Sequence, residues 1–477
     1  MSESDWDWVE MVLISGMVTQ KYEQVALIKE AKRRGKVVVV GGPFATSTPD
    51  IPKQAGADFL VLDEGEITIP RFIDALERGE TSGVFRADGE QADMSQSPPP
   101  RFDLLNFDHY MEMCIQFSRG CPYLCEFCDI PVLYGRVPRA KSPEQIIAEL
   151  DRLIELGSSK NVFIADDNFI GNKKKAKGLL AELITWQQEK GYPTQLYTEA
   201  TMNLADDDKL MLMMQKANFR AIFIGIESPD TDQLQTIKKK QNCGRPMIDR
   251  IQKIYRYGFR IIGGFIIGFD GETPGADRRI VEFAQNAAIP MLMVHMMSAL
   301  PNTPLTKRLE AQGQLRLENS YRDGHLTASL SNFALTRPLK EVAEEYINCM
   351  ETLYDPYVFY ERLYRHCMLV KPSPNIKRLK VKNKTEYKAL LVLLWRHGIK
   401  RPSRFRFWSY GIKIARKNPK AIRRFGSLCG QFEHFHNYNH TIREKIYQEY
   451  ESLGQSRFDV YEPDLAPLPV AITVNKP

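Results

Sequence analysis

Three cysteines lie within eight positions of the segment FSRGCPYLCEFCDI, residues 117–130. Cys121, Cys125 and Cys128 form a C-x3-C-x2-C pattern in a chain of 477 residues that contains eight cysteines in all. Thiolates bind soft metal ions, and clustered cysteines in a reducing compartment indicate metal binding or catalysis rather than disulfide bonds. The spacing therefore predicts a metal or cluster site on one short loop.

Two kinds of metal site compete for these three thiolates. A structural zinc site usually takes four protein ligands, commonly as two C-x2-4-C pairs, but the next cysteine downstream is Cys243. Cys114 could serve as a fourth ligand, although its place in a predicted strand favours packing. An iron–sulfur cluster with three protein thiolates and one open iron fits the number of cysteines better. That open iron could hold a substrate or a cofactor.

The segments around this loop alternate between strand and helix from residue 111 to residue 305. Apolar, β-rich runs are followed by amphipathic helices, such as the helix predicted over 142–157, which Ser142 caps. Six such repeats predict a full or partial parallel barrel whose active site lies at the C-terminal ends of the strands. The cysteine loop follows the first strand and so lies at this mouth. Five acidic residues follow later strands: Asp166, Asp167, Glu199, Glu227 and Asp270.

The remaining segments predict further domains. Residues 9–79 alternate buried strands with helices, as a parallel α/β sheet does, and their strand ends carry glycine-rich loops that suit a ligand. We therefore expect an α/β protein in which a truncated Rossmann-like domain precedes a partial (βα)6 barrel and a mostly helical region follows it. The expected boundaries are 1–85 for the first domain, 86–105 for a polar, proline-rich linker, 106–305 for the barrel and 306–477 for the helical extension.

Charge is distributed unevenly along the chain, whose net charge is +6. Residues 371–424 contain 18 Lys and Arg against one acid, Glu386. A basic helix face is most often simply solvated, but such a segment also suits an anionic membrane surface. Aromatic residues among the basic ones would suit nucleic acid as well, and we consider that partner the least favoured of the three.

No targeting or spanning segment is recognisable in the sequence. The N-terminus MSESDWDWVE is acidic, and no run reaches the roughly 18 apolar residues that a membrane span needs. We expect a cytoplasmic protein, either free or peripheral to the membrane. The cluster of His434, His436 and His440 favours packing or a polar surface over metal binding, because alternating histidines in an aromatic segment are a weak metal signal.

The segment CPYLCEFC resembles the C-x3-C-x-aromatic-C signature of the radical S-adenosylmethionine (radical SAM) superfamily. The resemblance implies that Cys121, Cys125 and Cys128 hold a 4Fe–4S cluster whose fourth iron chelates S-adenosylmethionine (SAM). It also implies that one-electron reduction cleaves SAM to a 5′-deoxyadenosyl radical, with an electron donor such as flavodoxin or ferredoxin. The cofactor supplies the difficult chemistry, and the protein supplies placement and exclusion of water.

The resemblance extends to residues that would contact SAM at successive strand ends. The segment GGFIIGFDGE resembles the family's G-x-I-x-G-x-x-E stretch, although its acid falls one position late, at Glu272. Acids after a strand also suit the N-terminal end of the next helix, because of its dipole. The implied SAM contacts are Phe127 beside the adenine, Asp166, Asp167 and Asn168 near the ammonium, Glu199 and Glu227 near ribose and methionine, and Gly264 and Gly268.

The N-terminal domain resembles that of cobalamin-dependent radical SAM enzymes. Its SGM segment stands at the family's S-x-L position, VVVVGG carries the family's glycine pair, and LDEGE resembles a later glycine-acid loop. The family's first motif, D-x-H-x-x-G, has no counterpart in the fourteen residues before Ser15, so we expect cobalamin on a shortened domain. The implied cobalamin contacts are Ser15, Gly16, Gly41, Gly42, Glu64 and Gly65.

The resemblance also implies a reaction class. The whole chain is similar to a group that includes hopanoid methylases and magnesium-protoporphyrin ester cyclases, and residues 306–477 resemble an uncharacterised extension found there. We expect a cobalamin-dependent enzyme that transfers a methyl group to an unactivated carbon of a small or lipid-like molecule. The alternatives are a radical SAM cyclase or oxidoreductase without methyl transfer and, less favoured, an enzyme that modifies RNA. The residues that contact the substrate are not identified by the sequence.

Overall fold

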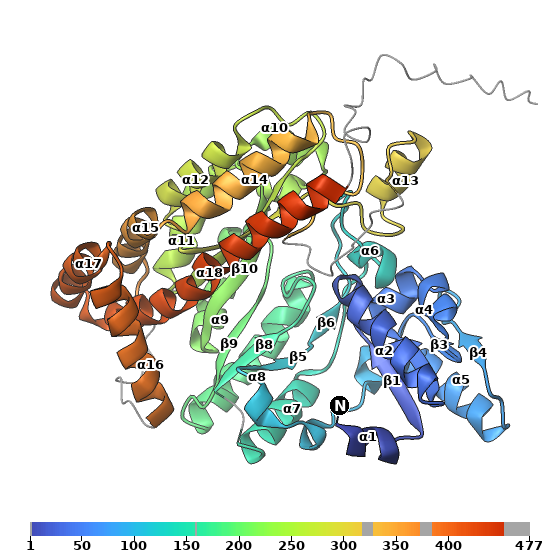
Figure 1. The fold of residues 1–477 in the computed structure, drawn as a ribbon. Coiled ribbons are helices and arrows are strands. Elements are labelled where there is room, and N and C mark those ends of the chain that lie inside the picture. The colour runs from blue at the N-terminus through green and yellow to red at the C-terminus, as the bar shows by residue number, and fades with distance from the viewer. Residues whose placement is uncertain (1, 158–159, 317–327, 373–383, 453–477) are drawn as a thin grey trace, which may run out of the picture.

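The computed structural model describes residues 2–157, 160–316, 328–372 and 384–452 of the chain. Figure 1 shows an N-terminal α/β unit, a larger sheet flanked by helices, and a group of C-terminal helices that lies against the larger sheet. The predicted fold class is confirmed. The domain boundaries stay predictions.

The N-terminal unit is built on a parallel sheet whose strand order follows the chain. Ile28, Val38 and Val40 are fully buried between its helix α2 and its second strand. The last strand was not predicted, because it lies beyond residues 9–79, where the predicted alternation ends. The strands are β1 (Met11–Ser15), β2 (Val37–Gly41), β3 (Phe59–Val61) and β4 (Gly83–Phe85). The helices are α1 (Glu3–Trp8), α2 (Lys21–Arg33), α3 (Gly42–Ser47), α4 (Asp50–Ala55) and α5 (Gly65–Glu77).

The larger sheet has six parallel strands in the order β5-β8-β9-β10-β11-β12. Each strand pairs with the next one in this order. Within the described residues the two edge strands, β5 and β12, do not pair with each other, so the barrel is open along one side. The strands are β5 (Met113–Ile115), β8 (Asn161–Ile164), β9 (Gln195–Glu199), β10 (Phe219–Glu227), β11 (Arg260–Ile267) and β12 (Met291–Met296). The helices that follow them are α7 (Pro143–Glu155), α8 (Lys173–Glu189), α9 (Asp208–Lys216), α10 (Thr231–Thr236), α11 (Met247–Arg256) and α12 (Ala276–Ala287).

Alternation along the strands separates the two faces of this sheet. In β10, Ile222, Ile224 and Ile226 are fully buried in the core shared with the helices. Phe223 and Gly225 alternate with them and are only half-buried. Because successive side chains point to opposite faces of a strand, Phe223 and Gly225 line the inner, concave face.

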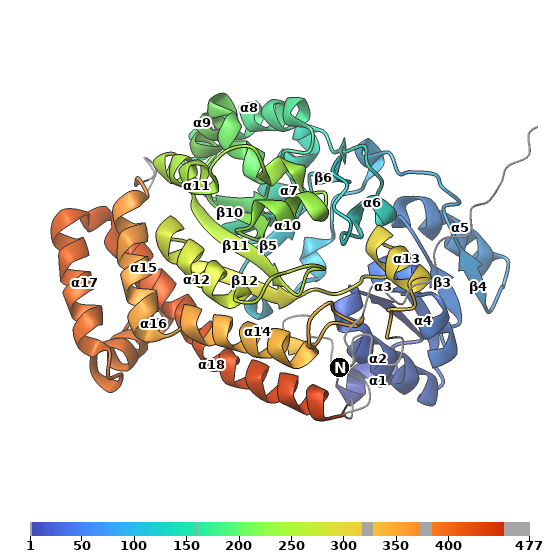
Figure 2. The ribbon, with the colours of Figure 1, turned by 90° about the horizontal axis from the view of Figure 1, so that it is seen from above.

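The C-terminal helices continue the core of the barrel. The Tyr354 hydroxyl donates to the carbonyl oxygen of Leu292 in β12 at 2.7 Å and accepts from the amide of the same residue at 3.1 Å. Figure 2 shows α18 running along α14 beside the barrel. His436 stacks on Phe432 and bonds to the carbonyl of Tyr354, whereas His434 and His440 are exposed, so one of the three histidines packs and two lie on the surface. These helices are α13 (Pro304–Ala311), α14 (Leu339–Leu353), α15 (Pro356–Leu369), α16 (Lys384–Trp395), α17 (Arg404–Lys417) and α18 (Ile422–Ser452).

The predicted linker, residues 86–105, is packed against the protein rather than loose. Met94 and Phe102 are buried. The side-chain amide of Gln145, in α7, donates to the carbonyls of Met94 and Ser97 at 3.3 and 3.1 Å. The segment therefore holds the N-terminal unit against the first helix of the barrel.

Candidate active site

The cysteine loop begins and ends in a small antiparallel hairpin. Gly120 must be glycine, because its φ is 96° and a Cβ there would lie 3.0 to 3.2 Å from three carbonyl oxygens of the returning segment. The Cys121 amide closes the loop by donating to the carbonyl of Gly135 at 3.3 Å. The hairpin, which was not predicted, consists of β6 (Ser118–Arg119) and β7 (Arg139–Ala140), and the short helix α6 (Ile130–Leu133) lies between them.

The three thiols lie together at the mouth of the barrel. Cys125 is buried, and Cys121 and Cys128 are half-buried. Burial raises the pKa of Cys121 and of Cys128, so both thiols would release a proton when they bind a metal. Within the described part of the chain, no three His, Cys, Asp or Glu side chains converge on a single ion.

Cys114 differs from expectation. It lies on β5, the edge strand of the sheet, and its side chain is exposed. The packing predicted for this cysteine is therefore wrong. Met113 and Ile115 point into the core instead, because side chains alternate along the strand.

Asp166 and Asp167 brace the chain that enters the cysteine loop. Asp166 is fully buried and accepts hydrogen bonds from the amides of Phe117 and Ser118 and from the Ser118 hydroxyl, at 2.6 to 2.9 Å. Asp167 accepts from the Gly120 amide at 2.8 Å. Burial raises the pKa of Asp166 to about 7 and that of Asp167 to about 6. These bonds fix the loop, and a contact of either carboxylate with SAM stays a prediction.

Glu199 is better placed to bind a cation. Its carboxylate, at the end of β9, has no hydrogen bond or ion pair within the described part of the chain. Burial raises its pKa to about 7, and the negative charges of Asp167, Asp166 and Glu227 add to this effect. A bound ammonium group would relieve that repulsion. The neighbouring Asn168 points its amide at Cys121 Sγ, 4.0 Å away, and its buried Oδ1 has no hydrogen-bond partner among the residues that the structure describes.

Glu227 is already paired with a buried lysine that the sequence did not reveal. Its φ is 67°, at a bulge in β10, and its carboxylate forms an ion pair with Lys239. Lys239 also lies over the ring of Phe127, 5.8 Å from the ring centre. Burial alone would lower the pKa of Lys239, but the charges of Glu227, Cys125 and Cys128 raise it. The lysine thus supplies a positive charge beside the thiolates.

The run in which Lys239 lies, IKKKQN, resembles a solvated basic segment, so no sequence signal separates this lysine from its neighbours. Gln241 in the same run was missed for the same reason. Its side-chain amide donates to Cys125 Sγ at 3.6 Å. Hydrogen bonds to cluster sulfurs tune the reduction potential of an iron–sulfur cluster.

The predicted glycine stretch at the end of β11 shapes the inner face. Gly264 lies on the concave side, where a Cβ would come within 2.9 Å of the ring of Phe223. Gly268 has a φ of 96°, and its amide donates to Glu272 at 2.8 Å. The displaced acid therefore closes its own loop, and burial raises its pKa to about 7.

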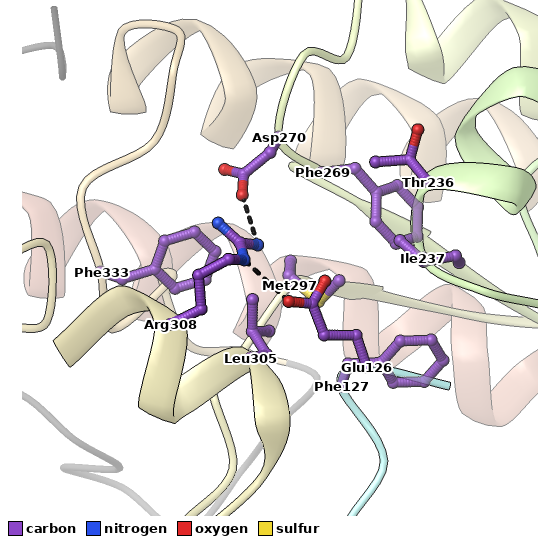
Figure 3. A pocket seen from close by; sticks show the side chains of 10 residues that line it. All are labelled: Glu126, Phe127, Thr236, Ile237, Phe269, Asp270, Met297, Leu305, Arg308 and Phe333. Atoms are coloured by element: carbon purple, nitrogen blue, oxygen red, sulfur yellow. Dashed lines mark hydrogen bonds and ion pairs between the residues drawn. The ribbon is translucent and has the colours of Figure 1, made fainter. Parts of the chain in front are cut away.

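Helix α13, from the C-terminal region, covers the cysteine loop. Arg308, in α13, donates to Glu126 and to Asp270 at 2.7 Å each, as Figure 3 shows. The Leu305 amide also donates to the carbonyl of Glu126 at 3.0 Å. The pocket beneath is lined by Phe127, Phe269 and Phe333 among others and leaves about 20 Å³, room for about one water molecule. Arg308 was not predicted, because it meets its partners only in the folded chain.

Comparison with known proteins assigns this arrangement to a family. Residues 115–284 match the radical SAM superfamily, and residues 303–448 match a domain of unknown function, DUF4070. An uncharacterised methyltransferase of Synechocystis sp. is 48% identical over 479 residues, which cover all of this chain and 89% of that protein. The hopanoid C-2 methylase of Rhodopseudomonas palustris is 34% identical over 418 residues, which cover 86% of this chain and 77% of that one.

The chain belongs to the radical SAM superfamily. The predicted recognition and the prediction of an enzyme are therefore confirmed. Among solved structures, the cobalamin-dependent SAM radical enzyme OxsB aligns with 97% of this radical SAM protein and 75% of its own chain, with a TM-score of 0.57 and 18% identity. The methyltransferase TsrM of Kitasatospora setae aligns with 65% of this protein and 68% of its own chain, with a TM-score of 0.56 and 16% identity. Both likenesses show a shared fold.

The N-terminal unit of this radical SAM protein meets the barrel across a cleft of about 170 Å³. Three of the six residues predicted to contact cobalamin line it, namely Gly42, Glu64 and Gly65, together with Arg119 and Tyr134 beside the cysteine loop. The structure does not place Ser15, Gly16 or Gly41 in the cleft lining. Gly41 packs instead, since a Cβ there would come within 2.7 Å of the carbonyl oxygen of Val61, whereas Ser15 is exposed.

Arg119 spans this cleft and holds its two sides together. Its Nη1 donates to Glu64 at 2.7 Å and to Glu66 at 3.0 Å. Arg139 donates to Glu64 as well, at 2.9 Å. Glu64 is therefore committed to a buried ion pair that joins the N-terminal unit to the hairpin of the cysteine loop.

Proposed function

We propose that this radical SAM enzyme is a methyltransferase that uses a 4Fe–4S cluster, SAM and cobalamin to methylate an unactivated carbon of a small or lipid-like molecule. The observation that carries the proposal is the place of the cysteine loop. It lies at the mouth of an open barrel and borders, through Arg119, the cleft with the N-terminal unit. Two relatives, the methyltransferase of Synechocystis sp. and the hopanoid C-2 methylase of Rhodopseudomonas palustris, support the same reaction.

The residues present fit the cluster and SAM. Cys121, Cys125 and Cys128 would hold the cluster, and the unpaired carboxylate of Glu199 would accept hydrogen bonds from the SAM ammonium. When bound, the cluster and SAM supply radical chemistry. Asp166 and Asp167 keep the loop in shape for this, through their bonds to the entering backbone.

Other residues would control charge and water at this mouth. Lys239 offsets part of the negative charge of the thiolates. Arg308 ties helix α13 to the cysteine loop and to Asp270, and so keeps bulk water from the mouth. Exclusion of water protects a reactive intermediate from side reactions.

The cleft fits cobalamin in position but not in size. It adjoins the cysteine loop, but its volume of about 170 Å³ lies below the roughly 300 to 1,000 Å³ that drug-sized ligands occupy, and cobalamin is larger still. Binding would therefore require the N-terminal unit to move away from the hairpin.

The partners follow from the same proposal. Radical SAM chemistry needs a reductant, and a flavodoxin or a ferredoxin would serve. Among the described helices, none is both long enough and apolar enough to cross a bilayer. A lipid-like substrate would bring the enzyme to a membrane surface, where the described basic residues of the segment 371–424 would meet anionic headgroups; residues 373–383 of that segment lie outside the described part of the chain.

Anaerobic reconstitution of the full chain with iron and sulfide, with and without hydroxocobalamin, tests the proposal. We expect about four irons per chain, as a 4Fe–4S cluster requires, cleavage of added SAM, and both S-adenosylhomocysteine and 5′-deoxyadenosine as products when cobalamin is present. The Cys125→Ala variant should lose iron and cleavage, whereas Cys114→Ser, at an exposed cysteine outside the loop, should keep both. Formation of 5′-deoxyadenosine without S-adenosylhomocysteine would instead favour the cyclase or oxidoreductase. A Cys125→Ala variant that keeps cluster and cleavage would contradict the whole assignment.

A further inference from the structure

The α16–α17 hairpin protrudes from the C-terminal region, at the end of the molecule opposite the N-terminal unit (Figures 1 and 2). Its base is fixed. His397 is buried between the hydroxyl of Tyr360, at 2.6 Å, and the carboxylate of Glu433, at 3.0 Å. Trp408 donates its indole N–H to the carbonyl of Gly398 at 2.9 Å and so joins α17 to the turn before it. The hairpin is therefore a built part of the fold.

The outer surface of this hairpin is unusually apolar. On α16 the large exposed side chains are Tyr387, Leu390, Leu391, Val392 and Trp395. Leu391 is 50% exposed and Trp395 is 58% exposed. Three consecutive exposed apolar residues are rare on a water-facing helix unless they bind something. A helix that is apolar on most of its sides is typical of a buried or membrane-associated one.

The turn and α17 carry four more large exposed apolar side chains, namely Ile399, Phe405, Trp408 and Ile412. Residues 387–412 thus hold nine of the 27 large hydrophobic side chains that are exposed in the described part of the chain. The clustering of a third of them on 26 residues marks this hairpin as an interaction surface rather than ordinary solvent-facing protein.

The charges around these residues are almost all positive. Residues 384–423 hold twelve Lys and Arg against one acid, Glu386. Arg396 and Arg401 pair with Glu433 at the base. The exposed basic residues Lys400, Lys413, Arg416 and Lys417 form no ion pair within the described residues. Their charge remains available for an anionic partner.

We propose that the α16–α17 hairpin docks on the surface of an anionic lipid bilayer, with its apolar side chains in the interface and its lysines and arginines at the headgroups. Apolar residues beside a basic, acid-poor surface are typical of helices that lie in the membrane interface. Tryptophan is enriched at that depth, because its ring is apolar and its N–H is polar. The helices described are not spanning ones, so the enzyme lies on the bilayer.

Charge and side-chain type favour a bilayer over nucleic acid. Five of the nine exposed side chains are aliphatic, namely Leu390, Leu391, Val392, Ile399 and Ile412. Nucleic acid binds aromatic rings by stacking but offers aliphatic side chains little apolar surface. The hydrocarbon boundary of a bilayer covers both. The purpose of this docking, access to a lipid-like substrate, rests on the proposed function. The docking itself does not, because vesicle binding is measured without cofactors.

Sedimentation of the full-length protein with vesicles tests this proposal. We expect binding to phosphatidylcholine vesicles that contain about 30% phosphatidylglycerol to be at least about tenfold tighter than binding to phosphatidylcholine alone, and to weaken in about 0.5 M salt. The L391S/W395S variant should bind about tenfold less at an unchanged Tm, because both side chains are exposed. The K413E/K417E variant should lose binding at low salt. A matched control, I69S/I73S, replaces apolar residues of similar exposure on α5 and should bind as the natural protein does.

Four results would overturn the proposal. The first is equal binding to neutral and anionic vesicles, and the second is undiminished binding by L391S/W395S. The third is no vesicle binding together with tRNA binding that L391S/W395S abolishes, which would assign the surface to nucleic acid. The fourth is no vesicle binding together with a dimer that the same variant dissociates, which would assign the surface to a second copy of the chain.

Discussion

Replacement of Arg119 by alanine should lower the free energy of unfolding by about 3 kcal/mol. Its side chain is 13% exposed, and that of Glu64, its partner across the domain cleft, is 4% exposed. Removal of one member of a buried ion pair costs about 3 to 5 kcal/mol, because a charge is left buried and unpaired. We expect the lower end of that range, since Arg139 still pairs with Glu64 at 2.9 Å.

The effect should also depend on pH through Glu66, the second partner. Burial alone would raise the pKa of Glu66, but the hydrogen bonds and charge of Arg119 lower it from 4.5 to about 2. A carboxyl whose pKa is lowered on folding contributes stability above its unfolded pKa and loses it as the pH falls through its folded pKa. The difference between the natural protein and Arg119→Ala should therefore be full at pH 7 and shrink between pH 4.5 and 2.

Urea unfolding at pH 7 and at about pH 3 measures both effects. The control is Arg71→Ala, because Arg71 pairs with Asp88 and Glu90 on the same unit but in solvent. Exposed pairs contribute about 0 to 1 kcal/mol, so this variant should lose no more than that. If Arg119→Ala loses no more stability than Arg71→Ala at pH 7, the buried ion pair of Arg119 and Glu64 does not stabilise the contact between the N-terminal unit and the barrel.

Three further predictions concern the active site and the helical region. Burial raises the pKa of Glu199 to about 7, so SAM binding by the reconstituted enzyme should weaken by about tenfold from pH 8 to 6, and Glu199→Gln should remove this dependence in equilibrium dialysis. Lys239→Met removes a positive charge and should make the reduction potential of the cluster more negative by on the order of 50–100 mV in an EPR-monitored titration. The control Lys240→Met, at an exposed lysine, should leave the potential unchanged. An unshifted potential in Lys239→Met would mean that Lys239 does not act on the cluster. Tyr354→Phe removes two hydrogen bonds to Leu292 and should cost about 1 to 3 kcal/mol of unfolding free energy, against no measurable change for the exposed Tyr357→Phe; equal losses would exclude a specific role for the buried hydroxyl.

The sequence by itself determined the local features of this protein. The spacing of Cys121, Cys125 and Cys128 identified the loop and, through it, the superfamily. Strand-helix alternation predicted the parallel sheets, because an apolar period is set by neighbouring residues and parallel strands need helical connections. The same local signals put Glu199 and Glu227 at strand ends, where the structure also has them, whereas Asp270 lies three residues beyond the end of β11.

Only the tertiary structure decided which charges are buried and which apolar residues are exposed. Glu64 was predicted to contact cobalamin, but it is 55 residues from the arginine that pairs with it, and no sequence period reports such a contact. Lys239 resembles a surface lysine until Glu227 and the thiolates surround it, and Leu391 resembles a core leucine although half of it is exposed. The type of a residue determines the free-energy cost of burying its side chain. Whether the side chain is buried depends on segments far apart in the chain, and only the fold brings those segments together.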